Sequence, residues 1–360
     1  MNGLAVAPVF SANNPHADAV HAAGNLHMKI VVFEAETWSE NACPSAFEGH
    51  TVVYVPEPLT PAHAASFSDA DIVSVFVGSQ VDRNCLEQLN NLKLVATRST
   101  GFDHIDLRAC REQGVAVTNV PTYGAPTIAE HVFALLLGIS HRLVDAVERT
   151  RCGAFSYQGL EGFDLSGKTI GVIGTGAIGQ CVVRIAGGFG MRVIAHDIAP
   201  DIQLADSVGI TYEGLETILR ESDVVTLHVP LNSTTRSMIS VAEFELMKKG
   251  VVLINTARGE VIDTPALIDA LESGKVAAAG LDVLADEALV RQACQADAAF
   301  RTHSHENPSL ALAQKLMALR NVLVTPHSAF NTREAIQRIN GITAKNITGF
   351  IAGSPTNIVS

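Results

Sequence analysis

The chain has 360 residues, of which 47% are hydrophobic and 17% are charged, and this composition excludes a disordered chain. The length predicts about two domains. The formal net charge of -12, with 37 acidic against 25 basic residues, argues against a protein that binds nucleic acid or docks on an anionic membrane.

Residues 1–27 are rich in Ala, Asn and His and show no hydrophobic period, so we expect a disordered extension. No basic residue precedes Lys29, which argues against a secretory signal or a transit peptide. The cysteines form no CxxC pair, which predicts reduced thiols, a cytoplasmic protein and no metal site.

Short, fully apolar runs recur in the first third of the chain, with helix-like stretches between several of them. Such runs are typical of parallel strands that are covered on both faces. The expected strands are residues 28–33, 51–55, 71–77, 92–97 and 115–120, and the expected helices are 84–90 and 106–113.

A long helix is predicted over residues 127–149. Thr127 and Glu130 have the spacing of a capping box, which marks the start of a helix. Apolar residues then recur from Val132 to Val147 at steps of three and four, so we expect one face of this helix to be buried.

A second alternating set of strands and helices starts near Lys168. The expected strands are residues 169–173, 192–196, 223–228, 251–255, 277–283 and 322–325, and the expected helices are 179–189, 215–220, 242–247 and 265–273. A final helix is predicted over 333–351, capped by Asn331 or Thr332. The whole pattern predicts an α/β protein with two doubly wound parallel sheets.

The first strand of the second set runs into a GxGxxG loop formed by Gly174, Gly176 and Gly179. Such glycines allow a tight turn, a close approach of the backbone to a pyrophosphate, and packing of the following helix on the strand. The next strand ends at Asp197, at the spacing where a carboxylate binds a ribose 2′-hydroxyl. Because that charge would repel a 2′-phosphate, we expect NAD and not NADP.

Three residue types suited to the chemistry of a keto acid follow other strands of this set. Arg258 could supply a two-pronged cation for a carboxylate. His327 could exchange a proton with a carbonyl oxygen, and Glu287 could hold that His oriented and charged. Spacing alone does not bring the three together. We interpret His131 and His228 as structural residues.

Several motifs in the same order resemble the D-isomer-specific 2-hydroxyacid dehydrogenases, and among them bacterial D-lactate dehydrogenases most. The resemblance covers the chain from Met28 to about Ser354. The matching stretches are Arg98–Asp106, Asn119–Tyr123, Ala129–His131, Lys168–Gly179, Asn255–Asp263, Gly280–Val283 and Thr325–Phe330.

The resemblance implies a role for each matching position. Arg258 would bind and polarise the 2-keto acid, His327 would donate the proton, and Glu287, in preference to Asp286, would be its partner. Tyr123 either contacts the substrate or only packs. The implied substrate-binding residues are Thr100, Gly101, Tyr123 and Arg258. The implied NAD-binding residues are Gly174, Gly176, Ala177, Ile178, Gly179, Asp197, Val229, Pro230, Thr235, Thr256, Ala257 and Asp282.

The family fold implies a discontinuous, flavodoxin-like substrate domain over residues 28–125 and 326–360. It implies a Rossmann NAD domain over residues 126–325, with the active site in the cleft between the domains. Residues 288–320 would form an enlarged segment with helical parts. The resemblance also implies a homodimer, formed through the NAD-domain faces that carry the long helix.

The expected activity is NADH-dependent reduction of a 2-keto acid, pyruvate first, to the D-2-hydroxy acid. A larger keto acid such as 2-ketoisocaproate or phenylpyruvate is the nearest alternative. A different class, NAD-sensing corepressors that act as interaction proteins, shares the fold and stands as the more distant alternative.

Overall fold

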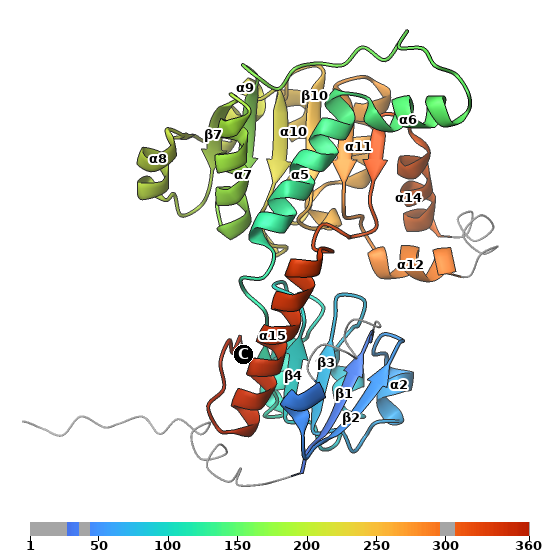
Figure 1. Cartoon of the computed structure of the whole chain (residues 1–360), viewed down its shortest axis with the longest axis vertical. Helices are drawn as coiled ribbons and strands as arrows, with labels where there is room; N and C mark the ends of the chain where they lie inside the picture. Colours follow the sequence, from blue (N-terminus) through green and yellow to red (C-terminus); the bar gives the residue numbers. More distant parts are fainter. Residues whose placement is uncertain (1–26, 36–43, 296–306, 360) are drawn as a thin grey trace, which may run out of the picture. The chain divides into compact units, whose positions relative to one another are not determined.

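The computed structural model describes residues 27–35, 44–295 and 307–359 of the chain. It divides into two compact units, with the residues up to Pro121 and from Ile339 onward in unit 1 and Thr122–Arg338 in unit 2 (Figure 1). The sequence suggested boundaries at residues 125 and 325. The chain leaves unit 2 within helix α15 (Arg333–Ile351). The expected N-terminal extension lies outside the described residues, except for His27.

Unit 1 contains a parallel sheet in the order β2-β1-β3-β4-β5. Its strands are β1 (Lys29–Phe33), β2 (Thr51–Val55), β3 (Ile72–Val75), β4 (Leu94–Thr97) and β5 (Ala116–Thr118). Side chains on both faces of the central strands are buried, which is why the strands read as continuous apolar runs and not as alternating ones.

Helices cover the two faces of this sheet. One core cluster joins the strands to α2 (Pro61–Ala65), α3 (Arg83–Leu86) and α4 (Leu107–Glu112), while a second joins them to α15 and the 3-10 helix η1 (Pro44–Phe47). Side chains of Asp82 and Asp106 cap α3 and α4 by accepting from the N–H groups of Cys85 and Ala109.

Unit 2 contains a parallel sheet in the order β12-β11-β10-β9-β6-β7-β8. Its strands are β6 (Thr169–Ile173), β7 (Arg192–His196), β8 (Thr211–Tyr212), β9 (Val224–Leu227), β10 (Val251–Asn255), β11 (Val276–Leu281) and β12 (Val322–Val324). Strand β6 pairs with both β7 and β9, so the strand order reverses there. Ligands of open parallel sheets bind at the carboxyl ends of the strands beside such a reversal. The two parallel α/β sheets confirm the predicted fold class.

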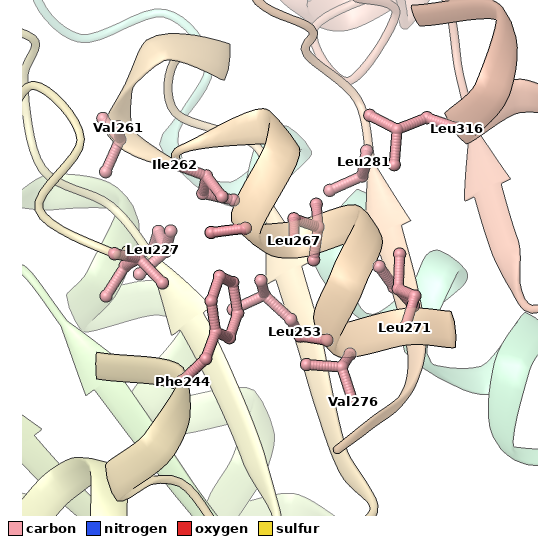
Figure 2. Close-up of a cluster of buried hydrophobic side chains, with 14 of the residues drawn as sticks. Leu227, Phe244, Leu253, Val261, Ile262, Leu267, Leu271, Val276, Leu281 and Leu316 are labelled. Carbon is pink, nitrogen blue, oxygen red and sulfur yellow. The ribbon is translucent and has the colours of Figure 1, made fainter. Parts of the chain in front are cut away.

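Two apolar layers fill unit 2. One lies between the sheet and helices α5 (Ala125–Ser140) and α7 (Ala177–Gly188). The other, drawn in Figure 2, packs Leu227, Leu253 and Leu281 of the sheet against Phe244 and Leu267 of the covering helices. The helices on that side are α9 (Leu215–Glu221), α10 (Val241–Leu246), α11 (Thr264–Glu272), α12 (Glu287–Gln295) and α14 (Pro308–Ala318). The remaining short helices are α8 (Ile202–Val208) and the 3-10 helix η2 (Gly259–Val261).

The prediction of one helix over 127–149 is wrong. The structure has α5 up to Ser140 and a separate α6 (Leu143–Arg151), bent by 63° relative to each other, with Arg142 at a positive φ of 50°. The N–H of Phe163 donates to the carbonyl oxygen of Ser140. This carbonyl is therefore satisfied by a residue outside the helix, and α5 ends at Ser140. As a result Leu143 is 55% exposed, although the apolar period placed it on the buried face.

The predicted capping box at Thr127 is also wrong, because α5 begins at Ala125 and Gly124 caps it without a side-chain hydrogen bond. Thr127 is buried inside the first turn, where its hydroxyl accepts from the guanidinium of Arg338. Among the described residues no single helix is long and apolar enough to cross a membrane. The bent pair of α5 and α6 meets that criterion by length and composition together.

Candidate active site

The GxGxxG loop joins β6 to α7 at the point where the strand order reverses. Gly174 has a φ of +95°, and a Cβ there would lie 2.7 Å from the carbonyl oxygen of His228. A Cβ on Gly179 would overlap the carbonyl oxygen of Gly174. Both positions therefore require glycine. Burial lowers the pKa of His228 to about 3, and its neutral ring shares a 2.9 Å hydrogen bond with Thr226, which agrees with a structural role.

The first turn of α7 offers space and donors for an anion. Gly176 caps the helix in an extended conformation without a side-chain hydrogen bond, and a Cβ placed on it would meet no atom within 4 Å. Gly176 and Ala177 are exposed and Ile178 is half-buried. A helix N-terminus with open backbone N–H groups binds phosphate well, so this cradle fits a dinucleotide pyrophosphate.

Asp197 follows β7 directly, beside this cradle. Its Oδ2 accepts from the N–H (2.6 Å) and the hydroxyl (3.0 Å) of Thr175, and its Oδ1 accepts from the N–H of Ala199 (2.9 Å). Partial burial on its own would raise the pKa of Asp197, but these hydrogen bonds outweigh it and hold the pKa below its usual value. The side chain is therefore an oriented carboxylate, suited to a ribose diol.

The other residues expected at the cofactor lie after neighbouring strands. Val229 and Pro230 follow β9, where the carbonyl of Pro230 accepts from the hydroxyl of Thr235 at 2.5 Å. Thr256 and Ala257 follow β10, and the hydroxyl of Thr256 is buried with no hydrogen-bond partner among the described residues. An unpaired buried hydroxyl at the carboxyl edge of the sheet fits a bound polar ligand.

His327 and Glu287 meet in a close pair. Nδ1 of His327 lies 2.7 Å from Oε2 of Glu287, and both side chains are largely enclosed. The second carboxylate oxygen, Oε1, accepts from the N–H of Leu284 at 3.1 Å, which fixes the carboxylate at the start of α12. It is Glu287, and not the adjacent Asp286, that contacts the imidazole. No described residue hydrogen-bonds Nε2 of the imidazole, so Nε2 is available to another partner.

Asp282 holds the segment that carries His327. The carbonyl oxygen of Asp282 accepts from the N–H of His327 at 2.9 Å, and its carboxylate accepts from the N–H groups of Ser328 and Ala329 at 2.9 Å each. His327 itself adopts a positive φ of 51°, a conformation that a non-glycine residue keeps only where its surroundings enforce it. Asp282 thus fixes the backbone on both sides of the strained residue.

Two more side chains reach the same carboxylate. The hydroxyl of Thr325 donates to Oδ1 of Asp282 at 2.5 Å, and Nε2 of His131 lies 3.0 Å from that hydroxyl and 3.4 Å from Oδ1. Burial alone would raise the pKa of Asp282, but the hydrogen bonds from His131, Thr325 and the backbone hold the pKa below its usual value. His131 is thus part of the hydrogen-bond network around Asp282.

Arg258 and Tyr123 lie in the same electrostatic environment. Tyr123 is buried, and burial raises its pKa to about 12, with an opposing effect from the charge of Arg258 and a smaller raising effect from Asp282. The phenol is therefore protonated and can donate. Nη1 of Arg258 donates to the carbonyl of Ala257, which directs the side chain along the end of β10.

Thr100 and Gly101 belong to unit 1, where they follow β4. The carbonyl of Thr100 accepts from the side-chain amide of Asn119, and its hydroxyl donates to the carbonyl of Val120, each at 2.8 Å. Neither backbone N–H of Thr100 and Gly101 donates to another described residue. These two groups can therefore bind an external anion such as a carboxylate.

An apolar cavity of about 870 Å³ adjoins the His327–Glu287 pair within unit 2. Its walls come from α5, α6, α12, α14 and β12, so the segment that the sequence suggested as an enlarged loop contributes helices to the site. The segment also contains α14, and residues 296–306 between α12 and α14 lie outside the described residues. Among the described residues no three His, Cys, Asp or Glu side chains gather to hold a metal ion.

The sequence did not predict the roles of Thr175 and Tyr212, which lie beside Asp197. Thr175 occupies a variable position of the GxGxxG loop, so the motif carries no signal for its contact with Asp197. Tyr212 lies on the two-residue strand β8, which was too short to predict, and its hydroxyl donates to that of Thr175 at 2.8 Å.

Comparisons with known proteins agree with this geometry. A family model for the D-isomer specific 2-hydroxyacid dehydrogenase, NAD binding domain, matches residues 133–329. A D-lactate dehydrogenase from Escherichia coli (strain K12) is 36% identical over 330 residues, covering 91% of this chain and 98% of that one. A glyoxylate reductase from Thermococcus litoralis is 33% identical over 344 residues, covering 92% and 97%.

A solved structure extends the likeness to three dimensions. The D-lactate dehydrogenase from Aquifex aeolicus, complexed with NAD and lactic acid, matches with a TM-score of 0.81 and 33% identity over 90% of this chain and 96% of that one. The family match, the two parallel sheets and the open glycine loop agree with one another. The chain therefore belongs to the D-isomer specific 2-hydroxyacid dehydrogenase family, and its cofactor is NAD.

Proposed function

We propose that the chain reduces pyruvate, or a close 2-keto acid, to the D-2-hydroxy acid with NADH. The contact of 2.7 Å between His327 and Glu287 carries the proposal, because keto acid reduction needs a positioned proton donor. Similarity to enzymes named for D-lactate favours pyruvate among the keto acids.

The bound NADH would supply the hydride to the carbonyl carbon. His327 would donate its proton from Nε2 to the carbonyl oxygen, since Nδ1–H is directed at Glu287. The carboxylate of Glu287 would stabilise the charged imidazolium, and Asp282 would hold His327 in its strained backbone conformation. Proton donation would leave a neutral His327, ready to take a proton in the reverse direction.

The substrate carboxylate would bind the backbone N–H groups of Thr100 and Gly101, and Arg258 would hold the carboxylate and polarise the carbonyl. The protonated phenol of Tyr123 would donate a hydrogen bond near the same anion. The dinucleotide would occupy the open cradle and the strand ends of unit 2. The residues proposed to line it are Gly174, Gly176, Ala177, Ile178, Gly179, Asp197, Val229, Pro230, Thr235, Thr256, Ala257 and Asp282.

A panel of keto acids tests the substrate. NADH consumption would be followed with pyruvate, glyoxylate, hydroxypyruvate, 2-ketoisocaproate and phenylpyruvate, using His327→Ala as the matched blank. We expect the highest kcat/KM with pyruvate and a fall of about 10²–10⁴-fold in the blank. A higher kcat/KM with 2-ketoisocaproate or phenylpyruvate would move the assignment to a larger substrate, and an unchanged blank would remove His327 as the donor.

A Glu287→Gln variant tests the pair separately. The imidazolium loses its anionic partner at Nδ1, so we expect kcat/KM for reduction to fall about ten-fold, with NADH affinity unchanged. An unchanged kcat/KM for reduction would show that Glu287 does not act on His327.

We also propose a homodimer formed through the face that carries α5 and α6. Leu143, Val144 and Val147 of α6 are 55%, 43% and 38% exposed, so this helix presents apolar side chains to solvent in the single chain. Light scattering at micromolar concentration should give twice the chain mass of 38.1 kDa. A mass equal to one chain would contradict the dimer.

A further inference from the structure

Three side chains form a directional row of hydrogen bonds behind the ribose end of the expected NAD site. The hydroxyl of Tyr212 donates to Oγ1 of Thr175 at 2.8 Å, and Oγ1 of Thr175 donates to Oδ2 of Asp197 at 3.0 Å. A carboxylate only accepts, and a hydroxyl has one proton, so the order of donation is fixed by chemistry. The row has one direction, from Tyr212 to Asp197.

The local fold places the three residues together. Thr175 is only 4% exposed, and its N–H also donates to Oδ2 of Asp197 at 2.6 Å. Strand β8 pairs with β7 so that Tyr212 lies beside Ala195, two residues before Asp197. The N–H of Glu213 donates to the carbonyl of Ala195, which holds this register at the edge of the sheet.

The row acts on the orientation of the carboxylate. Two donors from Thr175 occupy Oδ2, and the N–H of Ala199 occupies one acceptor position on Oδ1. The rotamer of Asp197 is therefore fixed, and the remaining acceptor capacity of Oδ1 has a constant direction. A carboxylate that is fixed before binding makes its hydrogen bonds without a further loss of side-chain entropy.

We propose that the Tyr212–Thr175 hydroxyl row is a positioning device that sets the preference for NAD over NADP through Asp197. This inference rests on the proposed role of Asp197 at the ribose. With the row intact, the carboxylate faces the ribose hydroxyls and repels a 2′-phosphate. Without the row, only the N–H groups of Thr175 and Ala199 hold the carboxylate, so its orientation is less restricted, it binds the diol less well and it repels a 2′-phosphate less.

Three variants test the proposal through the ratio of the Kd for NADPH to the Kd for NADH, measured by fluorescence titration of each dinucleotide, and through the matching ratio of kcat/KM with NADH to that with NADPH. Thr175→Val removes the hydroxyl at nearly constant volume, and we expect the ratio to fall about ten-fold, because one hydrogen bond to a charged group is lost. Tyr212→Phe should lower it about three-fold. The double variant should match Thr175→Val, since Tyr212 acts only through Thr175. KM for the keto acid should stay constant in all three.

The controls separate this effect from a loss of folding. Thr175→Ser keeps the donor and should retain the wild-type ratio. Tyr157→Phe removes the same hydroxyl as Tyr212→Phe but from a side chain that is 86% exposed, and it should leave the ratio unchanged. An unchanged ratio in Thr175→Val, or effects that multiply in the double variant, would overturn the proposal.

Asp197→Ala separates the proposed role of Asp197 from the proposed role of the hydroxyl row. If this variant keeps the wild-type ratio, the proposed role of Asp197 is refuted. The proposed role of the hydroxyl row is then refuted too, because the row acts through Asp197. If Asp197→Ala lowers the ratio and Thr175→Val does not, the role of Asp197 stands and only the hydroxyl row is refuted.

Discussion

The N–H groups beyond the carboxyl ends of the strands have different partners in the two parallel sheets. We call this end of each sheet its carboxyl edge. In unit 1 the carboxylate of Glu34 accepts hydrogen bonds from several of these N–H groups. The side chain of Glu34 accepts from the N–H groups of Phe76 (2.9 Å), Gly78 (2.8 Å) and Ser79 (3.1 Å), and from the Ser79 hydroxyl (2.6 Å). In unit 2 the glycine loop stays open, because no side chain caps α7 and Gly176 adjoins empty space.

Glu34 also connects the ends of three strands. It follows β1 with a φ of 50°, a conformation that is costly for a residue with a side chain. The buried guanidinium of Arg98, at the end of β4, donates to the carbonyls of Phe33 (2.7 Å) and Glu34 (2.9 Å) and to the hydroxyl of Ser74 in β3 (3.0 Å). Thr100 lies two residues beyond Arg98. The hydrogen bonds of Arg98 therefore also hold the start of the loop that carries the open N–H groups of Thr100 and Gly101.

Unit 2 has a comparable acid in Asp282, which accepts from the N–H groups of Ser328 and Ala329. The difference is that unit 2 keeps the glycine loop open as well, and carries Arg258, Glu287 and His327 beside its strand ends. Under the proposed function, we expect the edge closed by its own carboxylate to position the substrate and the edge with the open loop to take up the cofactor. Substitutions at the glycine loop of unit 2 should therefore change NADH binding, and those at Arg258, Glu287 and His327 should change kcat/KM for the keto acid. Substitutions at the closed edge of unit 1 should change KM for the keto acid and leave NADH binding unchanged.

The largest effect should come from Arg258→Lys. A lysine keeps the charge but cannot make a two-pronged contact with carboxylate and carbonyl oxygens. We expect kcat/KM for the keto acid to fall about 10²–10³-fold, the usual cost of losing a preorganised donor at a developing negative charge. NADH affinity measured by fluorescence should be unchanged. A normal KM and kcat would show that Arg258 does not hold the substrate.

Gly179→Ala should weaken the cofactor edge directly. A methyl group there overlaps the backbone of Gly174, so the loop has to move away from the helix. Overpacking of this kind corresponds to about a 10–100-fold loss in NADH affinity. Gly187→Ala, on the same helix with no atom near the new methyl group, is the matched control and should bind NADH normally. Equal affinities of the two variants would contradict the role of the close contact.

Glu34→Gln tests the edge of unit 1. The amide supplies one acceptor oxygen for four donors, so the Phe76–Ser79 loop loosens and moves the adjacent end of β4 with it. We expect KM for the keto acid to rise about ten-fold, since hydrogen bonds to a charged group are lost, with NADH affinity unchanged. Glu57→Gln removes the same charge from an exposed side chain nearby and should behave as wild type. A rise in KM for NADH instead would contradict the expectation that the edge of unit 1 affects only the keto acid.

The smallest effect concerns stability and Asp282. Its pKa is lowered in the folded protein, so its contribution to stability is complete above the unfolded value of about 3.9 and is lost as pH falls through the folded value. Asp282→Asn should therefore lower Tm by about 2–8 °C at neutral pH. The gap in Tm should close below about pH 4. A gap that stays constant with pH would show that the charge of Asp282 does not stabilise unit 2.

The sequence predicted the features that depend on local pattern. Continuous apolar runs located every strand of both sheets except the two-residue β8, and the glycine spacing located the cofactor loop, because each follows from constraints within a few residues. Thr332 shows the same for helix ends, since its hydroxyl accepts from the N–H of Ala335 as a predicted cap of α15 would. The residue types of Arg258, Glu287 and His327 pointed to one chemistry before their geometry was known.

The tertiary structure decided what depends on partners far along the chain. The break after Ser140 comes from Phe163, the hydrogen bond on the Thr127 hydroxyl from Arg338, and the two hydrogen bonds on Oδ2 of Asp197 from Thr175. It also decided that Glu287, and not Asp286, contacts His327 across forty residues of sequence. A helical period or a motif records which faces are apolar and where the backbone needs glycine. It does not record which distant donor reaches a given acceptor, because that choice is made only when the sheets and helices pack.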